Sequence, residues 1–226
     1  MIVGNGMIAN AFLKYSIDNN TIIFASGVSN SGETRESQFN REFELLKQFN
    51  VNKNHIIYFS TTSIYDNTLK ETSYIKHKNK VEDYIKENSY SYNIFRLPIV
   101  VGNTNNSYTL IKFLYQKIIN GDTIEVFSNA CRSILDVDDL SFIVNQILKL
   151  GAFKNDILDI HLSPKANILE IIESLETSIG IKANKKVLDR GNCYEIKDDR
   201  LKNFLNQIDY KIEQDYIFKT INKYYK

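Results

Sequence analysis

Short runs of β-branched and aromatic residues alternate with longer amphipathic stretches through the first hundred residues, and this alternation restricts the possible folds more than any other feature. Strands are expected at 1–3, 21–25, 55–60 and 93–101, and helices at 7–15, 36–49 and 74–86. A strand that is followed each time by a helix is the pattern of a parallel sheet with helices packed on it. We therefore predict an α/β fold.

Beyond Gly102 the pattern is less regular. Helices are expected at 108–119, 138–150 and 168–179, strands at 123–127 and 156–162, and a charged helical tail follows. We place a soft boundary at this glycine. Residues 1–102 form the main part of the sheet, and residues 103–226 form a mixed part that returns to the sheet and adds a small lobe. A chain of 226 residues is long enough for this arrangement.

The charge and the cysteine content argue against several classes of protein. The formal net charge is +1, and no basic stripe with interspersed aromatic residues is present, so nucleic acid is not an expected partner. Cys131 and Cys193 form no C-x-x-C pair, and His55, His77 and His161 have no metal-ligand spacing, so we expect a reducing compartment and neither a disulfide nor a metal. The sequence has no leader-like segment and no long apolar run. We therefore expect a cytoplasmic protein without a membrane span.

A glycine-rich turn lies between the first expected strand and the first expected helix. Gly4, Gly6 and Ala9 form the pattern G-x-G-x-x-A. Small residues at these places let the chain turn sharply and bring backbone N–H groups and the helix N-terminus close to a pyrophosphate. A plain tight turn between strand and helix is the alternative. The strand–turn–helix context favours a phosphate site.

Tyrosine and lysine occur four residues apart twice, at Tyr74–Lys78 and Tyr108–Lys112. With 14 tyrosines in the chain such pairs arise by chance, and only their context separates them. Positions 74, 78, 81 and 85 share one helix face, so Lys78 lies on an otherwise apolar stripe. A lysine that faces the core is costly unless it has a partner or a function. The alternative is a lysine that extends to solvent and pairs with Glu82.

Four hydroxyl side chains, Ser60 to Ser63, end the strand that precedes this helix. Ligands of open α/β sheets bind at the carboxyl ends of the strands. A hydroxyl there can hold a substrate carbonyl or alcohol. Tyr74, made more acidic by the Lys78 ammonium, can then exchange a proton while hydride moves to or from a cofactor. Ordinary capping of the loop by these hydroxyls is the alternative.

In their order along the chain these residues resemble a known family. The segment Phe59–Tyr65 is similar to the serine-rich phrase ending in Val-Tyr-Gly of the extended short-chain dehydrogenases/reductases, the nucleotide-sugar epimerase, dehydratase and reductase group. Further similarities are Tyr74, Lys78 and Glu82 on the helix, Arg96-Leu97-Pro98 on the next strand, the segment 132–139, and the late Asp199, Leu201 and Leu205. The resemblance runs over nearly the whole chain.

The resemblance implies a Rossmann-like cofactor-binding part at 1–102, a substrate lobe formed by the part at 103–226, NAD or NADP as cofactor, and a nucleotide-linked sugar as substrate. By the same match Thr61, Tyr74 and Lys78 are the catalytic residues, and Lys78 also holds the nicotinamide ribose. The implied cofactor contacts are Gly4, Asn5, Gly6, Met7, Ile8, Ala9, Ala25, Ser26, Ser60, Lys78 and Pro98. The implied substrate contacts are Thr62, Ser63 and Arg132, the last of which grips the diphosphate. A surface arginine paired with Asp136 or Asp138 is the alternative for Arg132.

The sequence departs from this family mainly in its N-terminal half. The glycine turn is one residue shorter than usual, Asp66 replaces a glycine, and Thr61 and Tyr74 are only 13 positions apart. The strand at 21–25 resembles the family's fourth strand, and no carboxylate follows it until Glu33. We therefore expect the second and third strands to be missing. The residue that grips the adenosine ribose and selects NAD or NADP is missing with them.

The loss of two strands affects the helix at 7–15. Crossovers between parallel strands are right-handed in about 98% of cases. If the first strand pairs directly with the strand at 21–25, three outcomes are open: the helix has changed faces, a left-handed connection remains, or 21–25 is a true second strand. A sheet face left uncovered would favour a partner or a homodimer.

Two functions follow from the sequence. The first is an NAD(P)-dependent oxidoreductase or epimerase that acts on a nucleotide-linked sugar through Thr61, Tyr74 and Lys78. The second is a catalytically inactive descendant that binds a nucleotide sugar or assists assembly, because the acidic residue of the adenosine site is missing. A third, an unrelated flavodoxin-like module, would leave Lys78 exposed.

Overall fold

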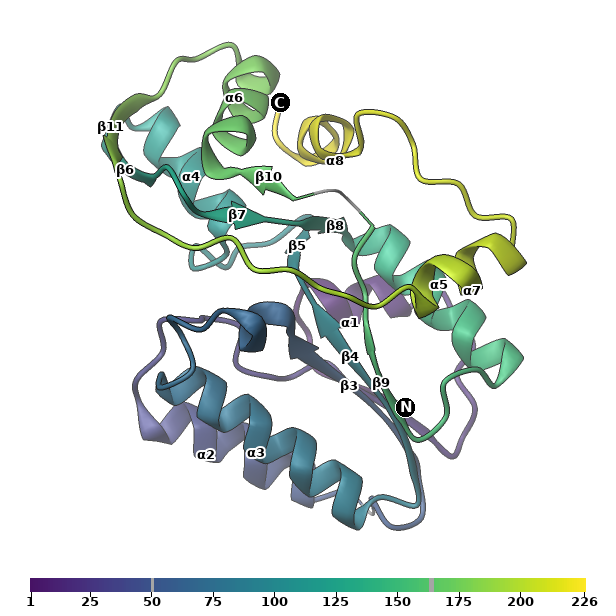
Figure 1. The fold of residues 1–226 in the computed structure, drawn as a ribbon. Helices are drawn as coiled ribbons and strands as arrows, with labels where there is room; N and C mark the ends of the chain where they lie inside the picture. The colour runs from purple at the N-terminus through teal and green to yellow at the C-terminus, as the bar shows by residue number, and fades with distance from the viewer. Residues whose placement is uncertain (50, 163–164) are drawn as a thin grey trace. The chain divides into compact units, whose positions relative to one another are not determined.

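In the computed structural model, which describes residues 1–49, 51–162 and 165–226, five parallel strands form the main sheet in the order β1-β2-β3-β4-β9 (Figure 1). The strands are β1 Ile2–Val3, β2 Thr21–Phe24, β3 His55–Thr61, β4 Ser91–Leu97 and β9 Asp156–Asp159. Their order in the sheet follows their order in the chain, and no strand lies beyond β1 among the described residues. The predicted α/β class, with a parallel Rossmann-like sheet that lacks two strands, is confirmed.

The chain divides into two compact units, and each unit is made of two stretches. The first unit contains Met1–Leu97 and Val137–Ile160, and the second contains Pro98–Asp136 and His161–Lys226. The last strand of the first unit, β9, pairs with β4 in register from Asn93 beside Asp156 to Arg96 beside Asp159. The chain therefore returns to the main sheet through β9.

Helices cover both faces of the sheet in the first unit. They are α1 Met7–Phe12, α2 Glu36–Lys47, α3 Ser73–Asn88 and α5 Val137–Leu150. Neighbouring side chains of a strand point to opposite faces. Tyr58 of β3 donates to Glu42 of α2, whereas the ring of the next residue, Phe59, lies 5.7 Å from the ring of Phe12 on α1. Thus α1 and α5 lie on one face, and α2 and α3 lie on the other (Figure 1).

This arrangement decides the position of the first helix. The crossovers β1-α1-β2, β2-α2-β3 and β3-α3-β4 all step in the same direction across the sheet. Because α1 lies on the opposite face from α2 and α3, the first crossover has the opposite hand to the next two. With the usual right hand for those two, β1-α1-β2 is left-handed. Of the three outcomes that the sequence leaves open, the structure has the left-handed connection.

The second unit is built from short paired strands and helices around its own apolar core. Its elements are β5 Ile99–Val101, α4 Leu110–Ile119, β6 Thr123–Phe127, β7 Cys131–Arg132, β8 Ile134–Asp136, β10 Ala166–Asn167, α6 Ile168–Ile179, β11 Asn184–Leu188, α7 Arg200–Gln207 and α8 Tyr216–Tyr224. β6 pairs with β11 and β5 with β8 in parallel, and β7 pairs with β10 antiparallel. The core gathers buried side chains of α4, α6 and α8, among them Leu114, Leu175 and Ile221.

Two differences from the predicted elements have clear causes. The single strand expected at 93–101 is divided at Pro98, which has no N–H to donate; β4 pairs with β3 and β9, and β5 pairs with β8. The strand β11 lies where a helical tail was expected, because its pattern Asn-Lys-Lys-Val-Leu is half exposed and gives no apolar run. Within the described ranges, no helix combines the length and the apolarity needed to cross a bilayer.

Candidate active site

The glycine turn between β1 and α1 is packed against the end of β2. Gly4 has φ +124°, and a Cβ atom there would lie 2.5 Å from the carbonyl oxygen of Ala25. The fold itself therefore requires glycine at position 4. A Cβ on Gly6, the N-cap of α1, would meet nothing within 4 Å, so this side of the turn is open. Of the other predicted contacts in the turn, Ala9 is buried, whereas Asn5 is exposed.

The three residues after β2 connect this turn to the predicted lysine. The Arg41 guanidinium donates to the hydroxyl of Ser26 at 3.3 Å and to its carbonyl oxygen at 3.2 Å. A Cβ on Gly27 would lie 2.9 Å from Nζ of Lys78 and 3.0 Å from Oε1 of Glu42. The backbone at the carboxyl end of β2 therefore touches the glycine turn at Ala25 and the lysine at Gly27.

Lys78 is buried and bound to two side chains. Its residue exposure is 2%, and Nζ donates to Oε1 of Glu42 at 3.1 Å and to the hydroxyl of Tyr58 at 2.9 Å. The hydroxyl of Tyr58 in turn donates to Glu42 at 2.7 Å. The suggestion that Lys78 extends to solvent and pairs with Glu82 is wrong, because Lys78 is buried and its ammonium binds Glu42 of α2. The flavodoxin-like alternative, which needs an exposed Lys78, is excluded with it.

Glu42 is the centre of this cluster and was missed by the sequence analysis. The side chain is fully buried, and its Oε2 accepts from the N–H of Val28 at 2.5 Å and lies 3.0 Å from Nε2 of His77. Burial alone would raise the pKa of this carboxyl, but the Lys78 charge and the hydrogen bonds from His77, Val28 and Tyr58 outweigh it and lower the pKa to about 2. The carboxylate is therefore ionised, and it neutralises the ammonium beside it.

A second buried carboxylate, that of Glu82, lies on α3 one helical turn beyond Lys78. Glu82 accepts two hydrogen bonds from Arg96 of β4, at 3.0 and 2.6 Å, and one from the hydroxyl of Ser60 at 2.5 Å. Arg96 also donates to the hydroxyl of Tyr65, which donates to Asp159 of β9. The hydroxyl of Ser60, which is predicted to contact the cofactor, thus donates its hydrogen bond to Glu82.

The hydroxyl residues that follow Ser60 take positions that fit capping. Oγ1 of Thr61 accepts from the N–H of Ser63 at 3.1 Å and caps the short 3-10 helix η1 Thr62–Tyr65. Thr62 donates to the carbonyl of Leu97 at 3.3 Å. The capping alternative therefore holds for Thr61. A capping oxygen still leaves the hydroxyl proton of this side chain for a second partner.

The predicted acid/base residue, Tyr74, is 7% exposed at the start of α3. Its ring packs in an apolar cluster with Val28, Phe39 and Ile75. Nζ of Lys78 lies 5.9 Å from the centre of this ring. The stripe predicted on this helix is confirmed, because Tyr74, Lys78, Val81 and Ile85 are all buried.

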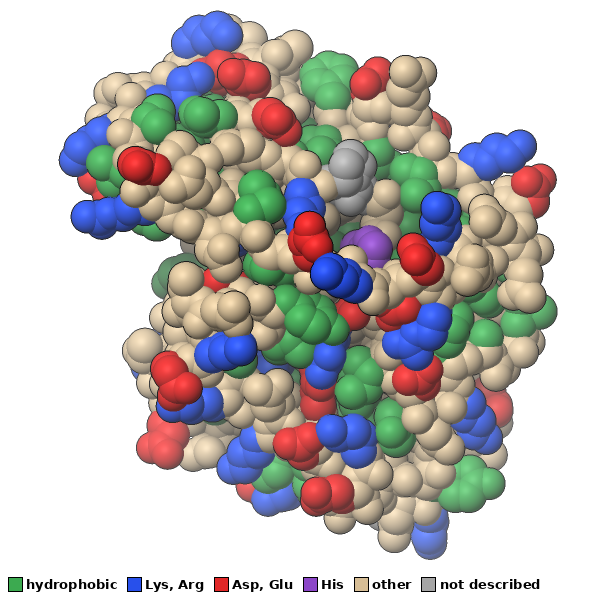
Figure 2. Space-filling view, viewed as in Figure 1, with side chains coloured by type: hydrophobic (Ala, Val, Ile, Leu, Met, Phe, Trp, Pro, Cys, Tyr) green, Lys and Arg blue, Asp and Glu red, His purple; other side chains and the backbone are tan. Residues whose placement is uncertain are grey.

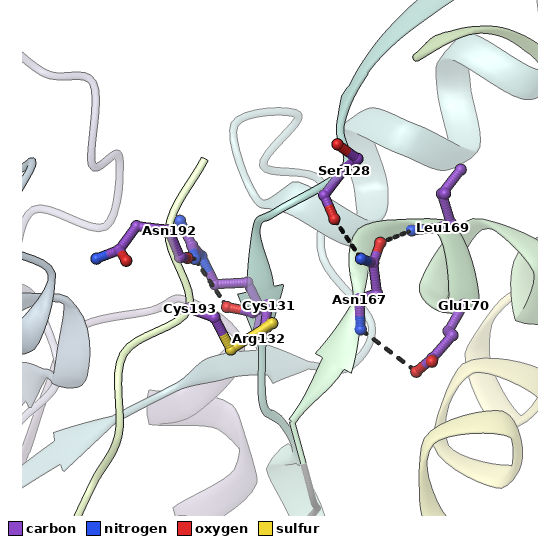
Figure 3. Close-up of a disulfide and its surroundings, with 8 residues drawn as sticks. All are labelled: Ser128, Cys131, Arg132, Asn167, Leu169, Glu170, Asn192 and Cys193. Atoms are coloured by element: carbon purple, nitrogen blue, oxygen red, sulfur yellow. Dashed lines mark hydrogen bonds between the residues drawn. A yellow bond between two sulfur atoms is a disulfide. The ribbon is translucent and has the colours of Figure 1, made fainter. Parts of the chain in front are cut away.

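Arg132 and Pro98, the remaining predicted contacts, belong to the second unit. Arg132 donates through Nη1 to the carbonyl oxygens of Cys131 at 2.7 Å and Asn192 at 3.2 Å (Figure 3). The aspartates proposed as its alternative partners bind other cations: Lys223 donates to Asp136, and Lys14 donates to Asp138.

A disulfide joins Cys131 to Cys193 beside Arg132 (Figure 3). The expectation of no disulfide is therefore wrong. The two cysteines are 62 residues apart in the sequence, and only the tertiary fold brings their Cα atoms to 4.7 Å. The argument from cysteine usage no longer supports a reducing compartment. The cytoplasmic location stays a prediction.

The surface shows no block of one charge on the face seen in Figure 2, where Lys and Arg side chains are interspersed with Asp and Glu. Within the described part of the chain no group of three or more His, Cys, Asp or Glu side chains is placed to hold a metal ion. The candidate site therefore consists of the glycine turn, the end of β2, and the two clusters around the carboxylates of Glu42 on α2 and Glu82 on α3.

Solved structures share this architecture over most of the chain. UDP-glucose 4-epimerase from Bifidobacterium longum, in complex with NAD+ and UDP, matches with a TM-score of 0.68 and 15% identity, covering 92% of this chain and 76% of that one. UDP-glucuronic acid 4-epimerase from Bacillus cereus, in complex with NAD, matches at 0.66 and 17%, covering 92% and 73%. The dTDP-glucose 4,6-dehydratase from Bacillus anthracis, also with NAD, matches at 0.65 and 14%, covering 89% and 71%. The chain has the Rossmann-like fold of these nucleotide-sugar epimerases and dehydratases.

Within that fold the chain is short. It spans about three quarters of the length of these three solved structures, and its main sheet ends at β1. No family model matches the sequence, and no curated protein matches it. The likeness is therefore one of structure.

Proposed function

We propose that the protein is an NAD(P)-dependent enzyme that acts on a nucleotide-linked sugar, by reduction of a 4-keto group or by epimerisation. The observation that carries the proposal is the contact chain from Gly4 through Ala25 and Gly27 to Lys78. These contacts connect a phosphate-binding type of turn to a lysine on the same helix as Tyr74. They lie at the carboxyl ends of the strands, where open α/β sheets bind ligands.

The nicotinamide half of a dinucleotide fits these residues better than the adenosine half. Gly6 leaves open space at the turn, and glycine at position 27 leaves Nζ of Lys78 uncovered by any side chain there. Lys78 has three N–H groups, two of which bind Glu42 and Tyr58, so one is left for a ribose hydroxyl. The nicotinamide ring, when bound, gives or takes the hydride. Beyond β1 no described strand offers a contact to the adenosine.

The chain's own residues then handle the proton. Tyr74 would donate to or accept from the sugar oxygen at the carbon that exchanges hydride, and Thr61 would hold that oxygen with its hydroxyl proton. The ammonium of Lys78 lies 5.9 Å from the centre of the Tyr74 ring, and Glu42 accepts from the same ammonium at 3.1 Å. Thr62 and Ser63 are proposed to contact the sugar. The second unit is proposed to bind the diphosphate through Arg132.

Titration of NADH and NADPH fluorescence with Tyr74→Phe and Tyr108→Phe as a matched pair tests this proposal. Tyr74→Phe is expected to keep dinucleotide binding and to lower turnover of a 4-keto nucleotide sugar by about 10²- to 10⁴-fold, as for loss of a general acid. Tyr108 belongs to the other Y-x-x-x-K pair and is exposed, so its substitution should change neither quantity. If the wild-type protein leaves the fluorescence of both dinucleotides unchanged at millimolar concentration, the enzymatic proposal fails.

One specific observation favours a second candidate, a catalytically inactive protein that binds a nucleotide sugar. The ammonium of Lys78 is already neutralised by a buried carboxylate, and the sheet ends where an adenosine site would begin. This candidate predicts that a nucleoside-diphosphate sugar raises Tm while a dinucleotide does not. A rise in Tm with the dinucleotide alone would count against it.

A further inference from the structure

A pocket of about 480 Å³ lies at the other edge of the same sheet, among the amino ends of β2, β3 and β4. It is lined by the loop that follows α1, by the first residues of β3 and β4, and by the end of α5. The shortness of α1 explains it. Six helical residues span about 9 Å, whereas the seven residues of β3 span about 23 Å. The helix starts at the carboxyl edge and ends before it reaches the amino edge.

The charges around this pocket are unbalanced. Lys53, Lys149 and Lys154 line it together with a single carboxylate, Asp18, which leaves an excess of two positive charges. Across the residues that the structure describes, none of the three lysines forms an ion pair. Like charges around a concave surface repel one another and attract anions. The pocket is therefore electrostatically prepared for a negatively charged molecule.

Polar side chains form the floor of the pocket. His55 bonds through Nδ1 to Ser91 at 2.6 Å and through Nε2 to Asn93 at 2.8 Å. Burial, with the charge of Lys154 in addition, lowers the pKa of His55 below its usual 6.5, so the ring is neutral at pH 7. It therefore adds nothing to the positive excess.

Asn145 supplies an independent observation. It lies on α5, its exposure is only 5%, and it lines the pocket. Its side-chain amide has no hydrogen-bond partner among the described residues. The amide is not one of the fully buried side-chain groups that lack a partner, so its donor and acceptor face the open space of the pocket. A ligand in the pocket can therefore form a hydrogen bond with it.

The loop between α5 and β9 forms one wall and is strained. Phe153 and Asn155 have φ values of 54° and 59°, in the left-handed region; asparagine tolerates this conformation, but it is strained for Phe153. Nδ2 of Asn93 donates to the carbonyl oxygens of Phe153 at 2.5 Å and Ala152 at 3.3 Å, and this holds the loop to the floor of the pocket. Backbone strain of this kind concentrates at ligand sites.

We propose that this pocket is a second ligand site, which binds a small molecule carrying two or more negative charges. Lys53, Lys149 and Lys154 supply the charge, and the amide of Asn145 supplies a hydrogen bond inside the pocket. The site is separate from the proposed active site, because it lies at the amino ends of the strands and the active site at their carboxyl ends.

Calorimetric titration with inorganic pyrophosphate, and with citrate as a second arm, tests the proposal and separates phosphate from carboxylate ligands. We expect binding of one anion per chain, with Kd at least about tenfold higher in K53Q/K149Q/K154Q, since each charged hydrogen bond lost is worth about a factor of ten. K80Q/K202Q/K226Q removes the same net charge from exposed lysines elsewhere and should bind as the wild type does. Among the described residues these lysines form no ion pair, and Lys80 lies over the ring of Phe43 as Lys154 lies over that of Tyr90. Absence of binding at millimolar anion, or an equal loss in both triple variants, overturns the proposal.

Asn145→Leu separates a ligand contact from a structural role. Replacing an unpartnered buried amide by an apolar group of similar size should leave Tm unchanged or raise it, while the affinity for the anion falls. A lower Tm together with unchanged anion binding would overturn the role given to this residue. None of these variants touches the proposed active site, so a failure of dinucleotide binding leaves the outcome of this test intact.

Discussion

In the described part of the chain, charged side chains are paired at one edge of the main sheet and form no ion pairs around the pocket at the other edge. At the carboxyl edge, the buried carboxylates Glu42 and Glu82 each have a cation within hydrogen-bond distance, Lys78 and Arg96. At the amino edge, Lys53, Lys149 and Lys154 surround a pocket without ion pairs among the described residues. Charges of the first kind are held by the fold and contribute to its stability, whereas charges of the second kind are free to bind a ligand.

The difference follows from what covers each region. α3 has 16 residues and α2 has 12, so both helices reach along the sheet and bury their charged residues against β3. α1 has six residues and stops short. A buried charge must be paired, because the cost of desolvation is otherwise too large, but a charge at a solvent-filled pocket keeps its hydration.

The largest expected effect is that of Glu42→Gln. It leaves the Lys78 ammonium buried without its carboxylate, and should lower the free energy of unfolding by about 3–5 kcal/mol, measured by urea denaturation. Glu44→Gln, on the exposed side of the same helix, is the control and should change it by less than about 0.5 kcal/mol. If Glu42→Gln lowers the free energy of unfolding only slightly, the ion pair between Glu42 and Lys78 does not stabilise the fold at this edge.

Acid should remove the same contribution without a mutation. The pKa of Glu42 is lowered to about 2 from a usual 4.5, so the folded state holds the carboxylate ionised where the unfolded state already binds a proton. The contribution is complete above pH 4.5, disappears as the pH falls towards 2, and amounts to about 3 kcal/mol. Unfolding curves between pH 6 and 2 for the wild type and Glu42→Gln should therefore converge at low pH. Parallel curves would contradict this assignment.

Arg96→Met should have a smaller effect. It removes both hydrogen bonds to Glu82, but the arginine side chain is 18% exposed, so water can partly replace it. We expect a loss of about 2 kcal/mol in the free energy of unfolding. Tyr65→Phe, which removes one bond to the same guanidinium and one to Asp159, should cost about 1 kcal/mol. If Tyr65→Phe lowers the free energy of unfolding more than Arg96→Met does, the hydrogen bond from Tyr65 to Asp159 of β9 contributes more to this cluster than the bonds between Arg96 and Glu82.

The smallest effect is expected at the amino edge. K53Q/K149Q/K154Q should change the free energy of unfolding by no more than about 0.5 kcal/mol, because these lysines make no ion pairs. At low ionic strength the variant should be slightly more stable than the wild type, and the difference should vanish as salt screens the repulsion. A clear loss of stability would break the comparison, because it would show that these lysines also hold the fold.

The sequence predicts the sheet and its helices because apolar periodicity is a local signal. The stripe Tyr74, Lys78, Val81 and Ile85 is read directly from helical spacing, and the burial of Lys78 follows. The partner of Lys78 was missed, although Glu42 is spaced with Phe39 and Leu46 on the buried face of its helix. A charged residue on an apolar stripe is the same signal that identified Lys78.

Other features have no local signal. The disulfide depends on the approach of two segments 62 residues apart. The pocket at the amino edge depends on α1 ending at Phe12, whereas the sequence predicted a helix to Tyr15. The ends of helices are decided by packing as much as by propensity, so a cavity that depends on three residues of helix length is not visible in the sequence.

The left-handed connection from β1 to β2 records how such a chain can be shortened. If two strands are excised from the edge of a right-handed α/β sheet, the helix before them can stay on its original face, packed on α5, while its strand takes a new neighbour. The residues that pack under the helix can then stay the same. Only the eight-residue link 13–20 has to change, and it forms the connection of unusual hand. A protein can thus lose a structural module and preserve its remaining interior, at the expense of a first connection of unusual chirality.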